Sequence, residues 1–337
     1  MFKTIGLKTF LICFLIVTFH SFSQKDTLPY KTFKKCLVSY VDVGYRSAPF
    51  TFYYPFSKEI NKLQYKNNFK PIVGFGASYS WISFRLSFSL PFNIKSEEKF
   101  GKSKFVDLGV DFTFKKTFWD IDAMTSTGYA ILNAKNWNDS TFKGNTNLIR
   151  EKTQLNYSGI NMWYFPNKGF RMQYFRGRNG YYEKPILTWY LKASMNFYGV
   201  NNEREPIIPN LFIDSTNSKT SSTAIAGFDL GAIPGVAYVN RIKNWQFGAM
   251  FGLGAMTQIK TYDFDGTPIA QSGFVARYDI KIIGGYTKEN FFAMLESQFN
   301  NKSIVYDNFK FRFFYHSIKL AVGYRFPIQF KPTKLLP

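Results

Sequence analysis

Cysteine and histidine are nearly absent from this sequence, which holds two of each in 337 residues. We expect Cys13 to be removed with an N-terminal targeting segment, which would leave Cys36 as the single cysteine and His316 as the single histidine. This excludes an intramolecular disulfide and a soft metal site built from cysteine and histidine ligands. We therefore expect neither a metal nor another cofactor.

Long apolar runs are also missing, apart from one near the N-terminus. Phe10 to Phe19 is predominantly apolar, follows Lys3 and Lys8, and precedes the small residues Ser21 and Ser23. This is the layout of a secretory signal peptide cleaved after Ser23. The run is too short for a transmembrane helix, which needs about 20 apolar residues, and no later stretch is long enough either.

Acidic residues are scarce, with 22 Asp and Glu against 43 Lys and Arg, which gives a formal net charge of +21. The excess could attract anionic lipopolysaccharide or an anionic solute. It could equally be a solvated basic surface on loops and periplasmic turns. The basic residues are spread along the chain without a nucleic-acid fold signature, so we expect no nucleic-acid partner.

Aromatic residues, by contrast, make up 20% of the chain, and they alternate with polar or small residues. In the stretch 82–90, Phe84, Leu86 and Phe88 alternate with Arg85 and three serines. Similar alternation recurs at 106–114, 187–197, 245–254 and 318–326. Since side chains along a strand point to opposite faces, each strand has one apolar and one polar face, and several are long enough to cross a membrane. The pattern predicts an all-β fold, a closed antiparallel up-and-down transmembrane β-barrel.

The number of strands is expected to be about 12, within a range of 10–14. Thirteen segments alternate: 38–48, 70–79, 82–90, 103–115, 118–132, 154–165, 169–176, 186–199, 224–238, 245–259, 272–286, 290–304 and 309–326. Bacterial barrels have an even number, so one is wrong, and the first and 169–176 are the most suspect. The apolar face changes parity near Phe314, which predicts a β-bulge there. Longer polar loops are expected at 133–153, 201–223 and 260–271.

The expected organisation follows from these limits. Residues 1–23 form the signal peptide, 24–37 a periplasmic segment, 38–326 the outer-membrane barrel and 327–337 a C-terminal tail. Trp81, Trp119, Trp163, Trp189 and Trp245 lie near strand ends and are expected at the membrane interface. The partners expected are outer-membrane lipid, including lipopolysaccharide, and the barrel-assembly machinery.

Charged residues on the polar faces are candidates for the lumen of the barrel. They are Arg85, Asp107, Asp111, Asp120, Asp122, Lys192, Asp229, Arg277, Asp279, Lys281, Glu296, Lys319 and Arg325. One interpretation is a charged constriction that selects a solute. The other is a set of ion pairs and hydrogen bonds that fill a narrow interior, and the presence of both signs favours it.

Catalysis is not expected. Barrel lipases use a histidine and a serine on one strand face, whereas His316 and Ser317 are adjacent and would point to opposite faces. A hydrogen-bonded nucleophile and base are therefore not available between them. No carboxylate is singled out as a protease-like residue either.

Four stretches carry a resemblance to a known family: Leu63 to Asn68, Gly76 to Ile82, Gly101 to Leu108 and Tyr164 to Lys168. In this order they resemble a family of Bacteroidetes proteins catalogued as domain of unknown function 4421, over most of the mature chain. The resemblance implies an outer-membrane location. It implies no established activity, and no functional residue is carried over.

Two functions are consistent with these observations. The first is a passive channel or transporter for small solutes, of unknown identity. The alternative is a non-conducting structural or interaction barrel that presents the loops 133–153 and 201–223 to envelope partners. An outer-membrane enzyme is the least favoured class.

Overall fold

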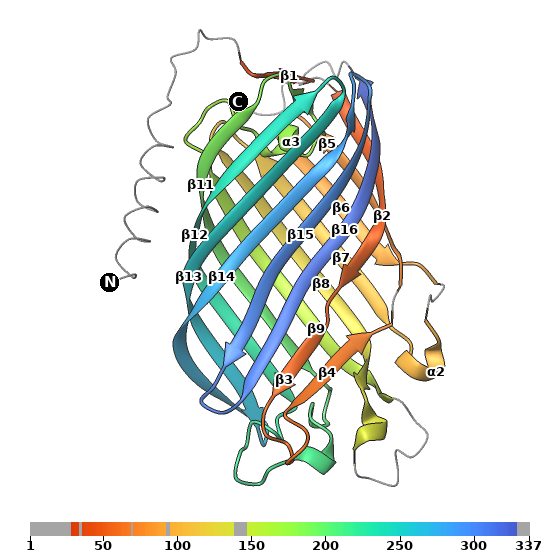
Figure 1. Cartoon of the computed structure of the whole chain (residues 1–337), viewed down its shortest axis with the longest axis vertical. Coiled ribbons are helices and arrows are strands. Elements are labelled where there is room, and N and C mark those ends of the chain that lie inside the picture. The colour runs from red at the N-terminus through yellow and green to blue at the C-terminus, as the bar shows by residue number, and fades with distance from the viewer. Residues whose placement is uncertain (1–27, 34–35, 69, 92–94, 138–146, 329–337) are drawn as a thin grey trace, which may run out of the picture.

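The computed structural model describes residues 28–33, 36–68, 70–91, 95–137 and 147–328, and its long strands close into a barrel (Figure 1). Twelve strands form the ring, in the order β2 (Cys36–Ser47), β5 (Ile72–Tyr79), β6 (Ile82–Ser89), β7 (Lys104–Thr113), β8 (Thr117–Leu132), β9 (Asn147–Tyr164), β11 (Ile186–Asn201), β12 (Ala224–Ile242), β13 (Trp245–Phe264), β14 (Thr267–Thr287), β15 (Phe291–Val305) and β16 (Lys310–Pro327). The strand β16 pairs antiparallel with both β15 and β2, which closes the ring. The expected closed antiparallel barrel of about twelve strands is confirmed.

Several expected boundaries are wrong. The segment 169–176 forms no strand, and it contains the short helix α3 (Met172–Phe175) instead. The expected loop 260–271 is mostly strand, because β13 continues to Phe264 and β14 begins at Thr267. The loop expected at 133–153 ends where β9 begins, at Asn147. The signal peptide 1–23 and the tail beyond 328 lie outside the described residues.

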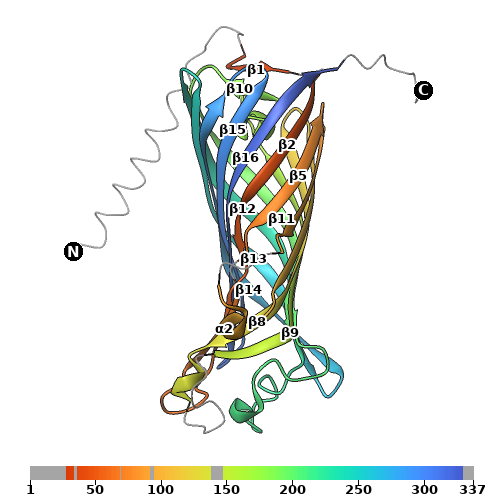
Figure 2. The ribbon, with the colours of Figure 1, turned by 90° about the vertical axis from the view of Figure 1, so that its right-hand side faces the viewer.

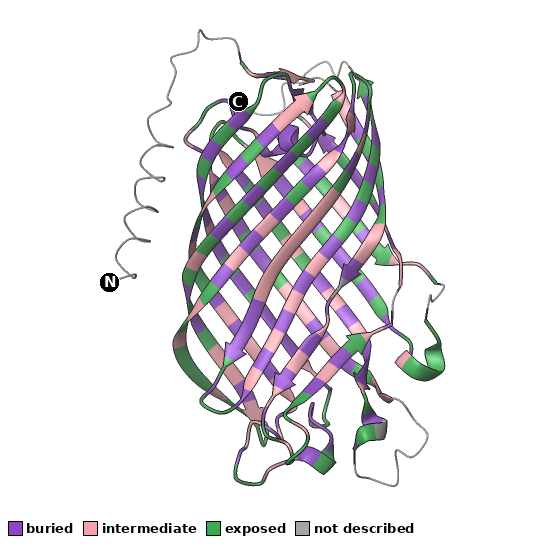
Figure 3. Ribbon diagram, in the orientation of Figure 1, coloured by how far each residue is buried: buried purple, intermediate pink, exposed green. Residues whose placement is uncertain are grey.

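The barrel has an apolar outer face, and exposure alternates along its strands (Figure 3). Large apolar side chains are exposed on every strand of the ring, among them Val43, Phe75, Phe84, Leu108, Ile121, Ile160, Leu191, Val236, Phe251, Ile282, Leu295 and Leu320. A continuous belt of this kind would be unfavourable in water and is what lipid hydrocarbon requires. No helix of the described residues is long and apolar enough to cross a membrane.

The wall has fewer strands at the end that bears the long loops. There, β3 (Phe50–Tyr53) pairs with β16, and β4 (Lys62–Asn67) joins β3 directly to β8. The β6–β7 hairpin does not reach this end, and its connection carries α2 (Glu97–Phe100) alongside the wall (Figures 1 and 2). The strands β5, β6 and β7 are thus bypassed, and the barrel narrows.

Aromatic and aliphatic side chains fill the narrowed end, which we call the loop-end core. Its members include Phe50, Phe52, Tyr65, Tyr129, Leu155, Tyr198, Phe309, Phe311 and Phe313. Along β16, Phe311, Phe313 and Tyr315 are buried on the same inward face as Ser317 and Lys319. The register with β15 is continuous, so the predicted β-bulge near Phe314 is wrong. The interior changes from charged to aromatic, and the strand does not change face.

The opposite end is closed by a segment between β9 and β11, residues 166–185, which we call the plug. It contains α3 and β10 (Gly180–Tyr182), and β10 pairs with the N-terminal β1 (Tyr30–Thr32). The plug and β1 lie at the end of the barrel that bears the short turns (Figures 1 and 2). The plug packs into a second cluster, the plug-end core, with Val38, Tyr40, Tyr190, Val239, Met250, Phe292 and Met294 of the wall.

A folded cap of loops covers the loop-end core. It comprises η1 (Ala134–Asn136) and the loop 202–223, which includes η3 (Asn210–Phe212). Phe212 is buried with its ring centroid 4.8 Å from that of Trp137. Tyr65 of β4 donates a hydrogen bond to the Ile207 carbonyl at 2.6 Å, which ties the cap to the wall.

Candidate functional site

The part of the interior between the two cores is charged. Of the thirteen charged residues expected in the lumen, ten are buried, and Arg85, Asp122 and Glu296 are partly buried. Twelve of these thirteen residues lie between the two cores, and the remaining one, Arg325, lies beside the plug. Asp42, Arg46, Arg176, Arg178 and Lys302 are also buried inside, and the sequence prediction missed them.

A branched ion-pair network crosses the wall strands β2, β6, β7 and β8. Arg46 and Arg85 both pair with Asp107, the latter at 3.0 Å. Arg85 also reaches Asp122, at 3.2 Å. Alternation along each strand places these side chains inside, and antiparallel pairing brings the strands together. The arrangement therefore pairs charges of opposite sign and forms no ring of one sign.

The plug adds two arginines to this network. Arg176 donates to Asp111 at 2.8 Å, and Arg178 donates to the same carboxylate oxygen at 3.2 Å. Arg178 also lies 3.6 Å from Glu296 and over the Tyr40 ring, at 4.4 Å from its centroid. Sequence reasoning missed both arginines because it assigned the start of this segment to a strand. The turn-rich run Arg176-Gly177-Arg178-Asn179-Gly180 was the available signal.

Two buried wall residues hold the plug through its main chain. Arg325 of β16 donates to the carbonyls of Gly177 and Arg178. Gln246 of β13 accepts from the Tyr182 amide at 2.9 Å and donates to the Tyr174 carbonyl at 2.8 Å. Buried backbone groups of a non-regular segment need such partners, so the plug is an integral part of the fold.

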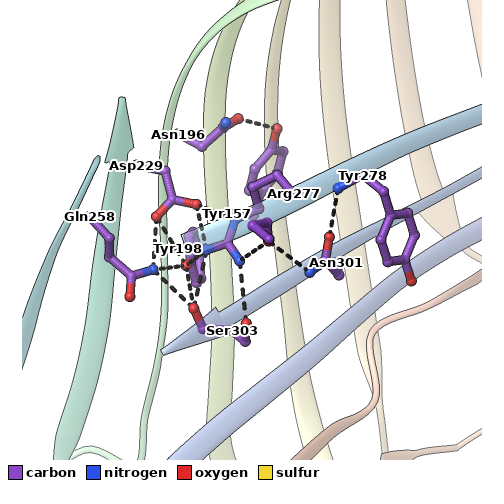
Figure 4. Close-up of polar contacts among 10 residues, drawn as sticks. Tyr157, Asn196, Tyr198, Asp229, Gln258, Arg277, Tyr278, Asn301 and Ser303 are labelled. Atoms are coloured by element: carbon purple, nitrogen blue, oxygen red, sulfur yellow. Dashed lines mark hydrogen bonds and ion pairs between the residues drawn. The ribbon is translucent and has the colours of Figure 1, made fainter. Parts of the chain in front are cut away.

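A second polar cluster lies near the loop-end core (Figure 4). The Arg277 guanidinium contacts the Asp229 carboxylate at 2.7 Å and donates to the Tyr198 hydroxyl at 2.6 Å. Gln258 donates to the other Asp229 oxygen at 2.9 Å. Gln258 and Arg277 both donate to the Ser303 carbonyl of β15, at 2.9 and 3.1 Å. The carboxylate is thus fully used in structural bonds.

This cluster stands beside a seam in the wall. The β14–β15 ladder ends at the pair Asp279 and Asn300, and beyond it the two strands have no backbone pairing. The side chain of Asn301 spans the seam to the backbone of β14, and Lys260 donates to the Val305 carbonyl. Side chains therefore complete the wall where the ladder stops.

The prediction that Trp163 lies at the membrane interface is wrong. Trp163 is buried inside the barrel. The ammonium groups of Lys192 and Lys281 lie 4.7 and 4.5 Å from its ring centroid. Trp81, Trp119, Trp189 and Trp245 are exposed on the outer side. On β9 the neighbours Met162 and Tyr164 point outward, so the strand alternation places Trp163 on the inward face.

His316 and Ser317 point to opposite faces of β16. His316 stacks on Phe299 and contacts Tyr45, with ring centroids 6.4 and 5.6 Å apart. Ser317 is buried on the inward face. The two side chains cannot form a nucleophile–base pair.

Two narrow cavities lie between the cores. One, of about 30 Å³, is lined by Asp120, Asp122, Lys192, Arg277 and Lys302 among others. The other, of about 20 Å³, lies beside the plug residue Arg176. Each is large enough for only about one or two water molecules. Neither cavity is large enough to hold a small organic solute.

The family model described as Domain of unknown function (DUF4421) matches residues 24–326, so the chain belongs to this family. The resemblance inferred from four sequence stretches is thereby confirmed. No curated protein matches the sequence.

Among solved structures, the outer membrane protease OmpT from Escherichia coli is 12% identical, with a TM-score of 0.39 over 89% of this chain and 99% of that chain. The translocator domain of the autotransporter NalP from Neisseria meningitidis is 9% identical, with a TM-score of 0.37 over 96% and 97%. An outer membrane channel from Pseudomonas putida F1 is 12% identical, with a TM-score of 0.39 over 89% and 100%. These are distant similarities, and the activities of those proteins are not transferred to this chain.

Proposed function

We propose that this member of the DUF4421 family is a sealed outer-membrane barrel that does not conduct solutes and presents its folded cap of loops to envelope partners. The observation that carries the proposal is that both ends of the charged interior are closed by packed cores. A conducting barrel needs a continuous water-filled lumen. Here the plug closes one end and the loop-end core closes the other.

Closure at the plug end is supported by the density of contacts. Nearly all residues from Phe170 to Tyr182 are buried. Ion pairs hold the plug to the wall through Arg176 and Arg178, and hydrogen bonds hold it through Gln246 and Arg325. Removing the plug would leave several buried charges without partners, which is costly in a low-dielectric interior.

Closure at the loop end is supported by aromatic packing. Phe50 stacks on its cross-strand neighbour Tyr65 with ring centroids 4.5 Å apart, and the rings of Phe52 and Phe311, paired on β3 and β16, lie 5.4 Å apart inside the narrowed barrel. Such a core resembles that of a soluble domain more than the mouth of a pore. It gives the cap a rigid base, which favours a role in contacts outside the membrane.

The outer-membrane location is part of the proposal. It rests on the signal-like N-terminus, the apolar belt and the contrast between short turns at one end and long loops at the other. In this orientation the cap faces the cell exterior, where lipopolysaccharide and surface partners lie. No catalytic step is included, because the carboxylates of the interior, with the exception of Asp120, take part in ion pairs.

Conductance in planar lipid bilayers tests the proposal against the passive-channel alternative. The purified full chain should give no steady current in symmetric salt, while a general porin prepared in the same way should conduct. A variant with both plug arginines replaced, Arg176→Ala and Arg178→Ala, should show at most transient openings, since the loop-end core remains. Steady, uniform channels from the full chain would overturn the proposal.

A further inference from the structure

The charges between the two cores do not balance. Nine cationic side chains lie there: Arg46, Arg85, Arg176, Arg178, Lys192, Arg277, Lys281, Lys302 and Lys319. Eight acidic side chains face them: Asp42, Asp107, Asp111, Asp120, Asp122, Asp229, Asp279 and Glu296. With all of these groups ionised, nine against eight leaves one positive charge without a counterpart, at the level of the membrane belt. An uncompensated charge in such a place is expensive.

Cationic side chains predominate in the lining of the smaller cavity, beneath the plug. Its lining includes the cationic side chains of Arg46, Arg85, Arg176, Lys281 and Lys319, and Glu296 is the one acidic side chain of that lining. Arg176 comes from the plug, whereas the others come from the wall strands β2, β6, β14 and β16. Arg46 and Arg85 are already paired with Asp107, and Arg176 with Asp111, so the spare positive charge of this pocket between the plug and the wall lies on its two lysines.

Two ammonium groups in this pocket lack hydrogen-bond acceptors. Lys281 is 5% exposed, and its Nζ has no acceptor among the described residues. Its closest cation–π contact is the Trp163 ring, 4.5 Å from the ring centroid. Lys319 Nζ also lacks a hydrogen bond within the described chain, and its nearest carboxylate oxygens, on Asp42 and Glu296, are 3.6 and 3.8 Å away.

We propose that the cavity beneath the plug binds one small monovalent inorganic anion, of the size of chloride. A water molecule could accept the hydrogen bonds of Lys281 and Lys319 but would leave the excess charge in place. A monovalent anion supplies both an acceptor and the missing charge. The cavity volume of about 20 Å³ matches a single small ion or water molecule and is small for an organic anion.

The position of the pocket gives the anion a structural role. It would contact Arg176 of the plug and Lys281 and Lys319 of the wall, so it would bridge the plug to the barrel. Binding to the folded state alone stabilises that state in proportion to ligand concentration. The folded protein should therefore be more stable in chloride than in a salt of equal ionic strength whose anion cannot enter.

Crystals of the full chain grown in sodium bromide test occupancy directly. An anomalous scattering peak is expected in the cavity, next to Lys281 and Lys319. Ordinary water density there, without an anomalous peak, would overturn the proposal. That result is also expected if the Lys281 amine is simply neutral and needs no counterion.

Thermal unfolding of the detergent-solubilised protein in sodium chloride and in sodium gluconate gives a second test. Chloride should raise the unfolding temperature in a saturable way, and Lys281→Met should abolish the difference between the salts. The matched control is Lys192→Arg, which alters a buried side chain beside the same Trp163 ring, outside this cavity, and keeps the number of interior charges unchanged. It should lower stability and keep the chloride effect. Equal unfolding temperatures of the wild-type chain in both salts, or loss of the effect in the control, would contradict the assignment.

Discussion

Asn301 of β15 hydrogen-bonds through its side chain to the backbone of Tyr278 in β14: its Oδ1 accepts from the Tyr278 amide at 3.0 Å. Its Nδ2 donates to the Ala276 carbonyl at 3.3 Å. The amide thus replaces two ladder bonds at the point where the backbone pairing of the two strands has ended. The barrel wall is closed there by a side chain.

Replacement of this amide should open the seam locally. We expect Asn301→Ala to cost about 1–2 kcal/mol, the range for losing two hydrogen bonds whose partners can reach water. Hydrogen exchange at the Tyr278 amide should accelerate. Asn156→Ala is the matched control, because that side chain bonds to the side chains of Thr125 and Gln154. Unchanged Tyr278 exchange in Asn301→Ala would show that the seam is closed by something else.

The pair of Asp229 and Arg277 should contribute far more than an exposed pair. Asp229→Ala leaves a buried guanidinium without its carboxylate, which should cost about 3–5 kcal/mol of unfolding free energy. Glu203→Ala, which breaks the pair with Lys152 at 3.4 Å, should cost under about 1 kcal/mol, because both side chains are more than half exposed. Urea unfolding in lipid vesicles measures both. Similar losses would argue against a desolvated interior.

A charged residue introduced on the outer face should lower the free energy of unfolding, and by more the deeper its position lies in the membrane. Leu108 and Phe251 are 39% and 51% exposed within the belt, so Arg at either should cost about 2–4 kcal/mol. Asn156 also points outward, but it lies on the part of β9 where the outward residues are polar. Asn156→Arg should therefore cost about 0–1 kcal/mol. At the inward Asp111, Arg would instead remove the acceptor of two plug arginines and loosen the plug. Equal costs at Leu108 and Asn156 would contradict the membrane placement.

The cap should loosen at acid pH. Hydrogen bonds from Thr216, and then from Tyr54, hold the pKa of the Asp214 carboxyl below its usual range, while the same contact with Asp214 raises the pKa of the Tyr54 phenol. A carboxyl with a lowered folded-state pKa stabilises at higher pH, and its contribution is lost as pH falls through that lowered pKa. The rate of hydrogen exchange in the loop 202–223, corrected for intrinsic rates, should rise when the pH falls below the usual range of carboxyl pKa values. Asp214→Asn should remove this dependence, and its persistence in that variant would contradict the role of Asp214.

The barrel class could be predicted because its determinant is local. Alternation of apolar and polar residues is visible within single strands such as β6, and it sets the face of each side chain. The plug was missed for the same reason. Phe170, Met172 and Tyr174 also alternate with smaller or polar residues, as in a strand. Here, however, the chain forms the helix α3, in which the apolar residues and the polar Gln173 are all buried.

The interior pairing could not be predicted in the same way. Asp229 and Arg277 lie on β12 and β14, which are separated by β13, so their contact depends on register and barrel curvature. The aromatic loop-end core also runs against the expectation of a polar lumen, and this produced the wrong bulge near Phe314. Arg46 and Lys302 could have been found, because both continue the alternation of neighbouring polar residues on their strands.

Tryptophan quenching by brominated lipid chains tests most directly whether the outer face meets hydrocarbon and the inner face is sealed. Two single-tryptophan variants are compared in vesicles, one retaining only the outward Trp189 and one only the inward Trp163, with the other tryptophans replaced by Phe. The emission of the Trp189 variant should be strongly quenched and that of the Trp163 variant spared. Equal quenching of both, or none of either, would contradict a sealed barrel embedded in lipid.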